Sequence, residues 1–451
     1  MALNRTVKKT AAWTFWAANL AIIVWFWTSG NASIELTSGD WVTIWHAFAR
    51  LLGLLATFCA LTQFVLMGRA SWLEPIFGMD RLAIFHRRNG VATILLIMAH
   101  SSSMVVTHAL LTGRGLVGGA EIVFGLPFIW WAAAAETLFI VTVFTSIIIV
   151  RKHLKFEWWY AVHMFNYLAI VLVPFHQFLN GDDLVSNTVF RYYWLALYIF
   201  AALTVLIWRF GRTLWLYWYF RFRVEKVVQE TPTAASVYFT GRNLQKFTSK
   251  AGKFILVRFF DKQRVWQEHP FSLSMLPNKD HFRITVRQLG DFTNSVPAIK
   301  PGTPVWVSGP FGAFTHDLQT KQKVLYIAGG IGITPLRTMI EERASHNQKD
   351  TAIMLYGNRT EADTALMGEL KPLAAKINMP IYNVLSDQQN YSGEKGFIDK
   401  EKIARLVPDV AERDVFLCGP PPMMWGIKKA LVELGVPEKQ VHYERFALHK
   451  D

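Results

Sequence analysis

Four histidines stand in two pairs on apolar stretches in the first half of the chain. His86 and His100 are fourteen residues apart, and His163 and His176 are thirteen apart. An iron with two protein axial ligands is coordinatively saturated, which suits electron transfer rather than oxygen binding. Two apolar helices that each offer an imidazole at two depths are therefore expected to hold two stacked haems. A polar contact within the membrane is the alternative role for each histidine taken alone.

The first spacing suits this arrangement better than the second. Fourteen helical residues rise about 21 Å and differ in phase by about 320°, so His86 and His100 share roughly one face. Thirteen residues differ by about 220°, which puts His163 and His176 on different faces of a regular helix. Pro174 lacks a backbone N–H and distorts helices, so it is the candidate for a distortion that brings His176 round.

The second half of the chain contains a different kind of motif, His269-Pro270-Phe271-Ser272-Leu273-Ser274. An aromatic ring followed by a hydroxyl at a strand end can stack on a planar ring and donate a hydrogen bond to its edge. An ordinary strand end is the alternative. Arg287 and the segment 290–293 follow, where glycine permits close backbone approach and a helix start offers N–H groups to a pyrophosphate.

Two glycine- and proline-rich turns follow strands farther along. Gly329-Gly330-Ile331-Gly332-Ile333-Thr334-Pro335 comes directly after an apolar strand and opens a helix, the context in which a glycine cluster indicates nucleotide binding. Cys418-Gly419-Pro420-Pro421-Pro422-Met423 follows the strand DVFL. Such a stiff turn leaves a ledge beside the strand end where a nicotinamide could lie.

Long apolar helices must carry the histidine pairs. A helix that crosses a membrane needs about 20 mostly apolar residues. We predict six such helices, at residues 11–28, 42–67, 83–111, 128–150, 158–179 and 189–210. The first follows basic residues, as a signal peptide would. It lacks a convincing cleavage site and five more spans follow it, so we interpret it as retained.

The motifs in the second half of the chain must be carried by a different kind of fold. From about residue 220, short alternating strands broken by Gly, Pro and Asn predict an antiparallel β-barrel. After Lys323 the order becomes strand, glycine turn, helix and strand, which predicts an α/β domain with a parallel sheet. The expected fold is thus a six-helix transmembrane bundle, an antiparallel barrel and a parallel-sheet nucleotide domain.

The placement of charge indicates an orientation. The 451 residues carry a formal net charge of +14, which alone could suggest a nucleic acid partner. Many basic residues instead flank alternate ends of the spans. We therefore expect no nucleic acid partner, and a plasma (inner) membrane location with both termini and the soluble half in the cytoplasm. With two cysteines, Cys59 and Cys418, no disulfide framework is expected.

Two charged residues lie inside the predicted spans. Arg50 is about nine residues into the second span, and Glu136 is about nine residues into the fourth, so both should lie at a similar depth. Charges within a membrane are costly and are usually paired or functional. Two interpretations stay open: an Arg50–Glu136 ion pair, and Arg50 as the binding partner of a haem propionate.

Taken together, these motifs resemble the ferric reductase and NADPH oxidase superfamily. The two histidine pairs, HPFSLS, GGIGITP and CGPPPM occur in the order typical of that family, and the resemblance covers nearly the whole chain. It implies a six-span haem-binding domain at 1–212, an FAD-binding barrel at 213–318 and an NAD(P)H-binding α/β domain at 319–451.

The resemblance also implies roles for individual residues. The axial ligands of two b-type haems would be His86, His100, His163 and His176. The FAD-binding residues would be His269, Pro270, Phe271, Ser272, Arg287, Gly290, Asp291 and Thr293, with Ser272 near the reactive nitrogen. The nicotinamide site would be lined by Gly329, Gly330, Gly332, Thr334, Cys418, Gly419 and Pro420.

The candidate catalytic residues are Ser272, Cys418 and Phe446. Cys418 has an alternative interpretation as a small buried hydrophobe. An aromatic residue near the family's C-terminus commonly covers the flavin until nicotinamide displaces it; Phe446 is the counterpart, although ALHKD extends past it. Arg359 follows the second strand of the nucleotide domain and suits the 2′-phosphate of NADPH, so we expect NADPH rather than NADH despite the nearby Glu361 and Asp363.

The expected function is electron transfer from cytoplasmic NAD(P)H through FAD and two haems to an acceptor across the membrane. Ferric iron chelates are the favoured acceptor, and oxygen reduction to superoxide by an NADPH oxidase is the alternative. Oxidases of this family tend to carry a polar residue, often His, one turn after the outer histidine of the third span, where this chain has Met104.

A nucleotide-regulated membrane transporter is a further alternative. In it, Arg50 and Glu136 would line a substrate path. The partners that we expect are the lipid bilayer and a small-molecule acceptor, with no obligate protein partner.

Overall fold

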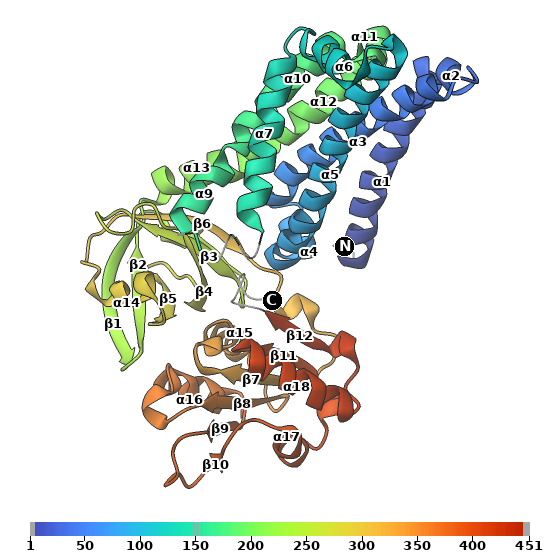
Figure 1. Ribbon diagram of the computed structural model, residues 1–451. Helices are drawn as coiled ribbons and strands as arrows, with labels where there is room; N and C mark the ends of the chain where they lie inside the picture. Colours follow the sequence, from blue (N-terminus) through green and yellow to red (C-terminus); the bar gives the residue numbers. More distant parts are fainter. Residues whose placement is uncertain (1–4, 148–149, 151–152, 155, 445–451) are drawn as a thin grey trace. The chain divides into compact units, whose positions relative to one another are not determined.

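The structure is a computed structural model that describes residues 5–147, 150, 153–154 and 156–444. The chain divides into two compact units: Met1–Phe77 with Arg81–Phe210, and Gly78–Asp80 with Gly211–Asp451. The first unit is helical, and the second contains two six-stranded sheets with their helices (Figure 1).

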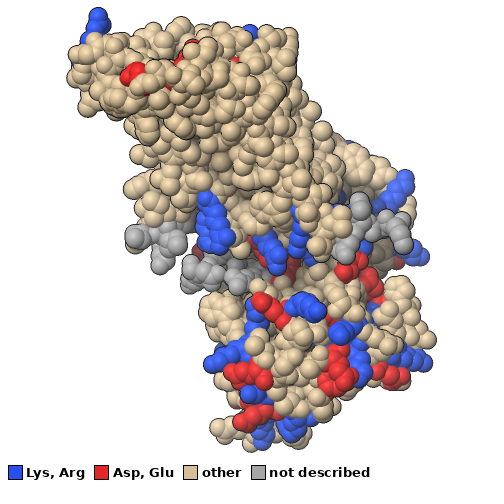
Figure 2. All heavy atoms as spheres, turned by 90° about the vertical axis from the view of Figure 1, so that its right-hand side faces the viewer, with Lys and Arg blue, Asp and Glu red and all other residues tan. Residues whose placement is uncertain are grey.

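The helical unit confirms the prediction of six apolar spans among the described residues. They are α1 (Arg5–Ser29), α3 (Trp41–Met67), α5 (Met79–Thr112), α7 (Ile129–Ser146), the α9–α10 span (Glu157–Asn180) and the α12–α13 span (Thr188–Phe220). The short helices are α2 (Asn31–Leu36), α4 (Glu74–Phe77), α6 (Gly115–Phe124) and α11 (Asp182–Ser186). The visible face of this unit is almost free of charge along its length, with acidic side chains near the end that carries α2, α6 and α11 (Figure 2). Such a surface suits a lipid environment.

Two of the spans are not regular helices. The fifth is interrupted at Phe165, between α9 (Phe156–Met164) and α10 (Asn166–Asn180). The sixth begins as α12 (Thr188–Thr204), winds as a π-helix over Val205–Gly211 and ends as α13 (Arg212–Phe220). This last span therefore continues past its predicted end at residue 210, because an apolar, aromatic run follows Arg212.

Aromatic side chains fill the interior of the helical unit. Phe190 and Trp194 of α12 are fully buried and belong to one cluster with Ile23 and Trp27 of α1. The indole N–H of Trp27 donates to the carbonyl oxygen of Ala47 at 3.0 Å, so this buried polar group is satisfied. These contacts fix how α1, α3 and α12 are rotated against one another.

The first sheet of the second unit is antiparallel, with the order β1-β2-β5-β4-β3-β6. Its strands are β1 (Arg223–Thr231), β2 (Ala234–Thr240), β3 (Phe254–Phe259), β4 (His269–Met275), β5 (Phe282–Arg287) and β6 (Val305–Phe311). Backbone hydrogen bonds also join the start of β1 to the start of β6, as in Val305 N–H to the Phe222 carbonyl at 2.9 Å. The antiparallel pairing confirms that part of the prediction, and closure into a barrel stays a prediction.

The second sheet is parallel, as predicted, with the order β10-β9-β8-β7-β11-β12. Its strands are β7 (Val324–Gly329), β8 (Ala352–Asn358), β9 (Ile381–Leu385), β10 (Glu394–Lys395), β11 (Asp414–Cys418) and β12 (Val441–Glu444). One apolar cluster joins it to α15 (Ile333–Ser345) and α16 (Met367–Lys376). Another joins it to α17 (Lys400–Leu406) and α18 (Pro421–Glu433). Because side chains alternate along a strand, the two helix pairs cover opposite faces.

Candidate cofactor sites

The carboxyl ends of β7 and β11 form the topological switch point of the parallel sheet. From β7 the chain moves outward through β8 and β9, and it returns on the other side of β7 with β11. Ligands of open α/β sheets bind where the strand order reverses in this way. The structure brings the Gly329–Thr334 turn and the Gly419–Pro420 turn together at this point.

Glycine is required at this switch point because the two turns approach backbone to backbone. A Cβ atom on Gly419 would lie 3.1 Å from the backbone nitrogen of Gly329, and one on Gly332 would overlap the carbonyl group of Cys418. Gly330 has a φ of 52°, which favours glycine. Thr334 is buried, and its hydroxyl donates to the Ile331 carbonyl at 3.0 Å, so this side chain holds the turn.

The thiol of Cys418 is fully buried at the end of β11, with Sγ 3.8 Å from the Glu444 carbonyl oxygen. Burial raises the pKa of this thiol well above its ordinary value, so it stays protonated. These observations suit the interpretation of Cys418 as a small buried residue. Phe446, predicted to cover the flavin, lies outside the described residues.

Asn358, at the carboxyl end of β8, is a site residue that no motif indicated. Its side chain is 9% exposed, and neither amide atom makes a hydrogen bond of normal geometry. Buried polar groups are normally paired, so this amide is a candidate contact for a bound nucleotide. Its sequence signal was slight, a single asparagine at a strand end.

Arg359 follows Asn358 directly and is exposed. Its Nε donates to the Asp387 carboxylate at 2.7 Å, and Asp387 follows the end of the neighbouring strand β9. A 2′-phosphate that bound Arg359 would have to share this side chain with Asp387. The acidic residue that forms an ion pair with Arg359 is therefore Asp387, and neither Glu361 nor Asp363 does so.

The predicted flavin motif forms β4 in the antiparallel sheet. Ser272 is 4% exposed, and its buried Oγ makes no hydrogen bond of normal geometry. The ring centroids of His269 and Phe292 are 4.0 Å apart, and Phe271 stacks on Phe292 with centroids 6.2 Å apart. A buried, unpaired hydroxyl beside an aromatic cluster fits a ligand with a planar, hydrogen-bonding edge.

Arg287, at the end of β5, reaches toward the nucleotide-binding turn. Its terminal NH1 atom would be 3.5 Å from a Cβ atom added at Gly330, so residues of both sheets meet there. The predicted phosphate-binding segment after it is less open than expected. The helix α14 (Asp291–Ser295) is short, and the Thr293 hydroxyl accepts hydrogen bonds from the N–H groups of Leu289 and Gly290 at 2.9 and 3.0 Å.

In the helical unit, the structure brings His86 of α5 and His163 of α9 together. Their ring centroids are 5.9 Å apart. Both Nδ1 atoms are buried and lack a hydrogen bond of normal geometry. Two imidazoles that bind one metal ion through nitrogens at about 2.0–2.1 Å have centroids about 6 Å apart, so the centroid separation leaves room for a metal ion between the two rings.

His100 and His176 lie close enough to interact electrostatically. The Nδ1 atom of His100 lies 2.8 Å from the Ala49 carbonyl oxygen, which orients the ring and leaves Nε2 as the ligand atom. A Cβ atom added at Gly53 would be 2.8 Å from the His100 ring. The ring thus packs directly against the backbone of α3, and only glycine leaves it this space.

The fifth span is interrupted between His163 and His176, so the phase of a regular helix does not apply to this pair. The break lies at Phe165, directly after the segment with His163, and the Asn166 amide donates to the His163 carbonyl at 2.8 Å. Pro174 lies inside α10, so the interruption occurs nine residues before it. Gln177 then fixes the rotation of α10, because its amide contacts Thr57 at 2.5 Å and Trp194 at 3.1 Å.

The predicted Arg50–Glu136 pair is wrong. Arg50 forms ion pairs with Glu35 at 2.8 Å and Asp183 at 3.0 Å, whereas Glu136 accepts a hydrogen bond from Ser101 at 2.9 Å. Similar depth was a poor guide to pairing, because helix rotation decides which side chains face each other. Both acidic partners of Arg50 are short-helix residues that lie outside the predicted spans.

Among the described residues, no group of three or more His, Cys, Asp or Glu side chains could hold a metal ion. The histidine pairs offer two ligands each, which is what a haem iron takes from the protein in a bis-histidine site.

Comparisons with known proteins match each part of the chain to a family. Residues 52–174 match the "Ferric reductase like transmembrane component", residues 222–315 an "FAD-binding domain" and residues 326–429 the "Oxidoreductase NAD-binding domain". These three domains define a membrane-spanning protein with the flavin- and nucleotide-binding parts of an NAD(P)H oxidoreductase. The chain has the domain architecture of the ferric reductase and NADPH oxidase superfamily, which confirms the resemblance.

Curated relatives match half of the chain. Flavohemoprotein B of Dictyostelium discoideum is 31% identical over 254 residues, 50% of this chain and 58% of its own length. The glycine betaine monooxygenase reductase subunit of Chromohalobacter salexigens is 29% identical over 234 residues, 50% of this chain and 63% of its own length. The chain thus spans about three fifths of the length of these relatives.

Solved structures give fainter likenesses. Flavohemoglobin from Malassezia yamatoensis covers 88% of this chain and 96% of its own, at 20% identity and a TM-score of 0.48. The cytochrome b5 reductase domain of Ulva prolifera nitrate reductase matches 50% of this chain and 97% of its own length, at 23% identity and a TM-score of 0.45. These likenesses are too slight to support a statement about activity.

Proposed function

We propose that the protein transfers electrons from NAD(P)H across a membrane to ferric iron chelates, with FAD and two b-type haems as cofactors. The observation that carries the proposal is the spacing of the His86 and His163 imidazoles, 5.9 Å between ring centroids, within a domain of the ferric reductase type. The flavin- and nucleotide-type domains follow in the same chain. When bound, these cofactors would supply the hydride and single-electron chemistry.

The histidines serve as the haem ligands in this proposal. His86 and His163 would hold one haem and His100 and His176 the other, and the Ala49 carbonyl would orient His100. Arg50 remains a candidate partner for a propionate, but Glu35 and Asp183 already balance its charge. A propionate that bound Arg50 would therefore have to compete with two carboxylates.

The second unit would bind the flavin and the nucleotide. Ser272 would donate its unpaired hydroxyl to the flavin edge, beside His269, Pro270 and Phe271, and Arg287 with the 290–293 segment would hold the rest of FAD. The switch point between β7 and β11 would hold nicotinamide, with Asn358 and Arg359 toward the adenosine end. This division corresponds to the proposed domains 1–212, 213–318 and 319–451. The basic flanks of the spans support a cytoplasmic location for the two soluble domains, and the proposed location of the protein is a plasma (inner) membrane.

Met104 supports a chelate rather than oxygen as acceptor. His108 lies one turn farther along α5. Its Nδ1 atom lies 2.9 Å from the Met104 carbonyl oxygen, so this ring nitrogen already has a partner. The Met104 side chain is a thioether, which has no proton to donate to reduced oxygen.

Purified protein with NADPH or NADH under nitrogen tests the proposal. We expect reduced b-type haem absorption and ferrous-chelate formation under nitrogen, and ferrous-chelate formation that is insensitive to superoxide dismutase in a parallel assay in air. Iron reduction that needs oxygen and stops with the dismutase would indicate an oxidase. Protein without haem absorption would favour the transporter alternative.

A further inference from the structure

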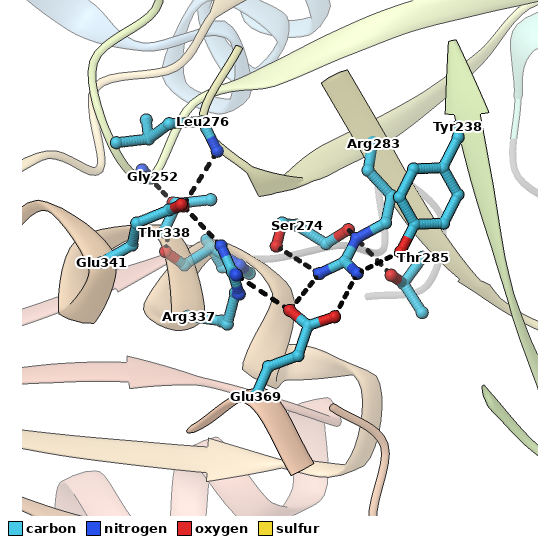
Figure 3. A network of polar contacts seen from close by, with 11 residues as sticks. Tyr238, Gly252, Ser274, Leu276, Arg283, Thr285, Arg337, Thr338, Glu341 and Glu369 are labelled. Carbon is cyan, nitrogen blue, oxygen red and sulfur yellow. Dashed lines mark hydrogen bonds and ion pairs between the residues drawn. The ribbon is translucent and has the colours of Figure 1, made fainter. Parts of the chain in front are cut away.

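A polar network joins the antiparallel sheet to the nucleotide domain within the second unit (Figure 3). Arg283 of β5 lies at its centre. Its guanidinium forms a bidentate ion pair with Glu369 of α16, with NH1–Oε1 and NH2–Oε2 distances of 2.6 and 2.9 Å. Glu369 also accepts from Arg337 of α15 at 2.8 Å. Glu369 thus links Arg283 of β5 to Arg337 of α15.

All five N–H donors of Arg283 are used. Besides Glu369, they reach the Ser274 hydroxyl and carbonyl, both at 3.0 Å, and the Tyr238 hydroxyl at 2.9 Å. Ser274 also accepts from Thr285 at 2.8 Å. An arginine has five such donors in a fixed plane, so this side chain is held in one orientation. The partners from its own sheet are neutral, and the nucleotide domain supplies the opposite charge.

Burial makes that charge important. The Arg283 side chain is 1% exposed. A buried charge that loses its partner is strongly unfavourable, so separation of the two domains is opposed at this point. Two more contacts reinforce the junction. The Leu276 N–H donates to Glu341 of α15 at 3.0 Å, and the Gly252 N–H donates to Thr338 at 2.8 Å.

The junction lies close to both proposed cofactor sites along the chain. Ser274 is two residues after Ser272 on β4, and α15 begins directly after the 330–332 turn. The network therefore couples the strand that would contact flavin to the helix that begins at the nucleotide turn. Reaction rates are very sensitive to the placement of the reacting atoms. A displacement of about 1 Å can lower the rate by about 100-fold.

We propose that Arg283 and Glu369 are positioning residues for hydride transfer, which lock the nucleotide domain onto the flavin sheet. This inference rests on the proposed function of the second unit. Arg337 and Glu341 extend the lock, since they form an ion pair that connects Glu369 to the Leu276 backbone. Neither Arg283 nor Glu369 is among the residues that we propose to contact the flavin or the nucleotide.

Anaerobic stopped-flow reduction of the flavin in the full-length protein tests the proposal, with NADPH and NADH. In Glu369→Gln, the limiting rate should fall at least about tenfold. The half-saturating nucleotide concentration should change less than about threefold, and FAD content should be unchanged. A double variant, Arg283→Met with Glu369→Gln, leaves no unpaired buried charge. It should fold and show the same slow reduction.

Glu394→Gln is the matched control, since it breaks the Arg405–Glu394 pair inside the nucleotide domain. Its reduction rate should equal that of the wild type. If the wild type is reduced and the double variant stays within twofold of it, the positioning role is overturned. If neither nucleotide reduces the wild-type flavin, the proposed function is wrong, and this inference, which depends on it, is wrong as well.

Discussion

The His100 ring lies against Gly53, so closely that a Cβ atom added there would be 2.8 Å from both Cε1 and Nδ1. Gly53→Ala should therefore displace His100 although alanine favours a helix by about 1 kcal/mol. We expect the haem-to-FAD ratio to fall from two toward one, measured by absorption of the purified protein. Gly426→Ala, where a Cβ meets open space in α18, should keep both haems. An unchanged ratio in Gly53→Ala would contradict the assignment of His100.

The two turns at the switch point should be equally intolerant of a side chain. Gly332→Ala would force a methyl group onto the Cys418 carbonyl. Overpacking of this kind costs about 1–3 kcal/mol in the free energy of unfolding. We expect a lower thermal midpoint and weaker nucleotide binding, measured by calorimetry and by titration of flavin reduction. A variant as stable as Gly426→Ala, with wild-type binding, would show that the turns do not pack so closely.

The Arg359–Asp387 pair should control the choice between NADPH and NADH. Asp387→Asn leaves Arg359 without its carboxylate partner and should raise the ratio of kcat/KM for NADPH over that for NADH. Arg359→Ala should lower the same ratio, because the positive charge for a 2′-phosphate is lost. Steady-state assays with both nucleotides measure it. If both variants have the same ratio of kcat/KM values as the wild type, Arg359 and Asp387 do not contribute to the nucleotide site.

Glu342 should make stability depend on acid pH. A hydrogen bond from His316, at 2.6 Å, lowers the pKa of this carboxyl below its ordinary value of 4.5, although burial opposes the shift. A depressed pKa stabilises the fold above about pH 4.5, and this contribution is lost as pH falls through the folded-state pKa. Thermal midpoints of wild type and Glu342→Gln should therefore differ at pH 6 and converge as the pH falls below the folded-state pKa of Glu342. Parallel curves throughout would contradict the assignment.

Local patterns predicted most of the fold. Apolar length located the spans and strand alternation located the sheets, because both depend on near neighbours in the chain. The positions of His86 and His100 followed from helical periodicity for the same reason. The interruption at Phe165 carries no proline or glycine, so the rotation of His176 could not be derived.

Long-range pairing was the part that could not be predicted. Arg50 has partners 15 and 133 residues away, and Arg283 has one 86 residues away. Arg283 looks like any polar residue in an alternating strand, and Glu369 looks like a solvated helix residue. Their pairing depends on how two sheets meet, which no local pattern encodes. Asn358 could not be predicted for a similar reason, since its burial and the lack of a hydrogen bond of normal geometry at its amide depend on the folded structure.

The most direct test of the account is the haem content of His100→Ala and the rate at which it reduces a membrane-impermeant ferric chelate in proteoliposomes with NADPH on the other side. The wild type should contain two haems per FAD and reduce the chelate. The variant should contain one haem, keep flavin reduction and lose reduction across the membrane. A variant that keeps both haems and the wild-type rate would contradict the account.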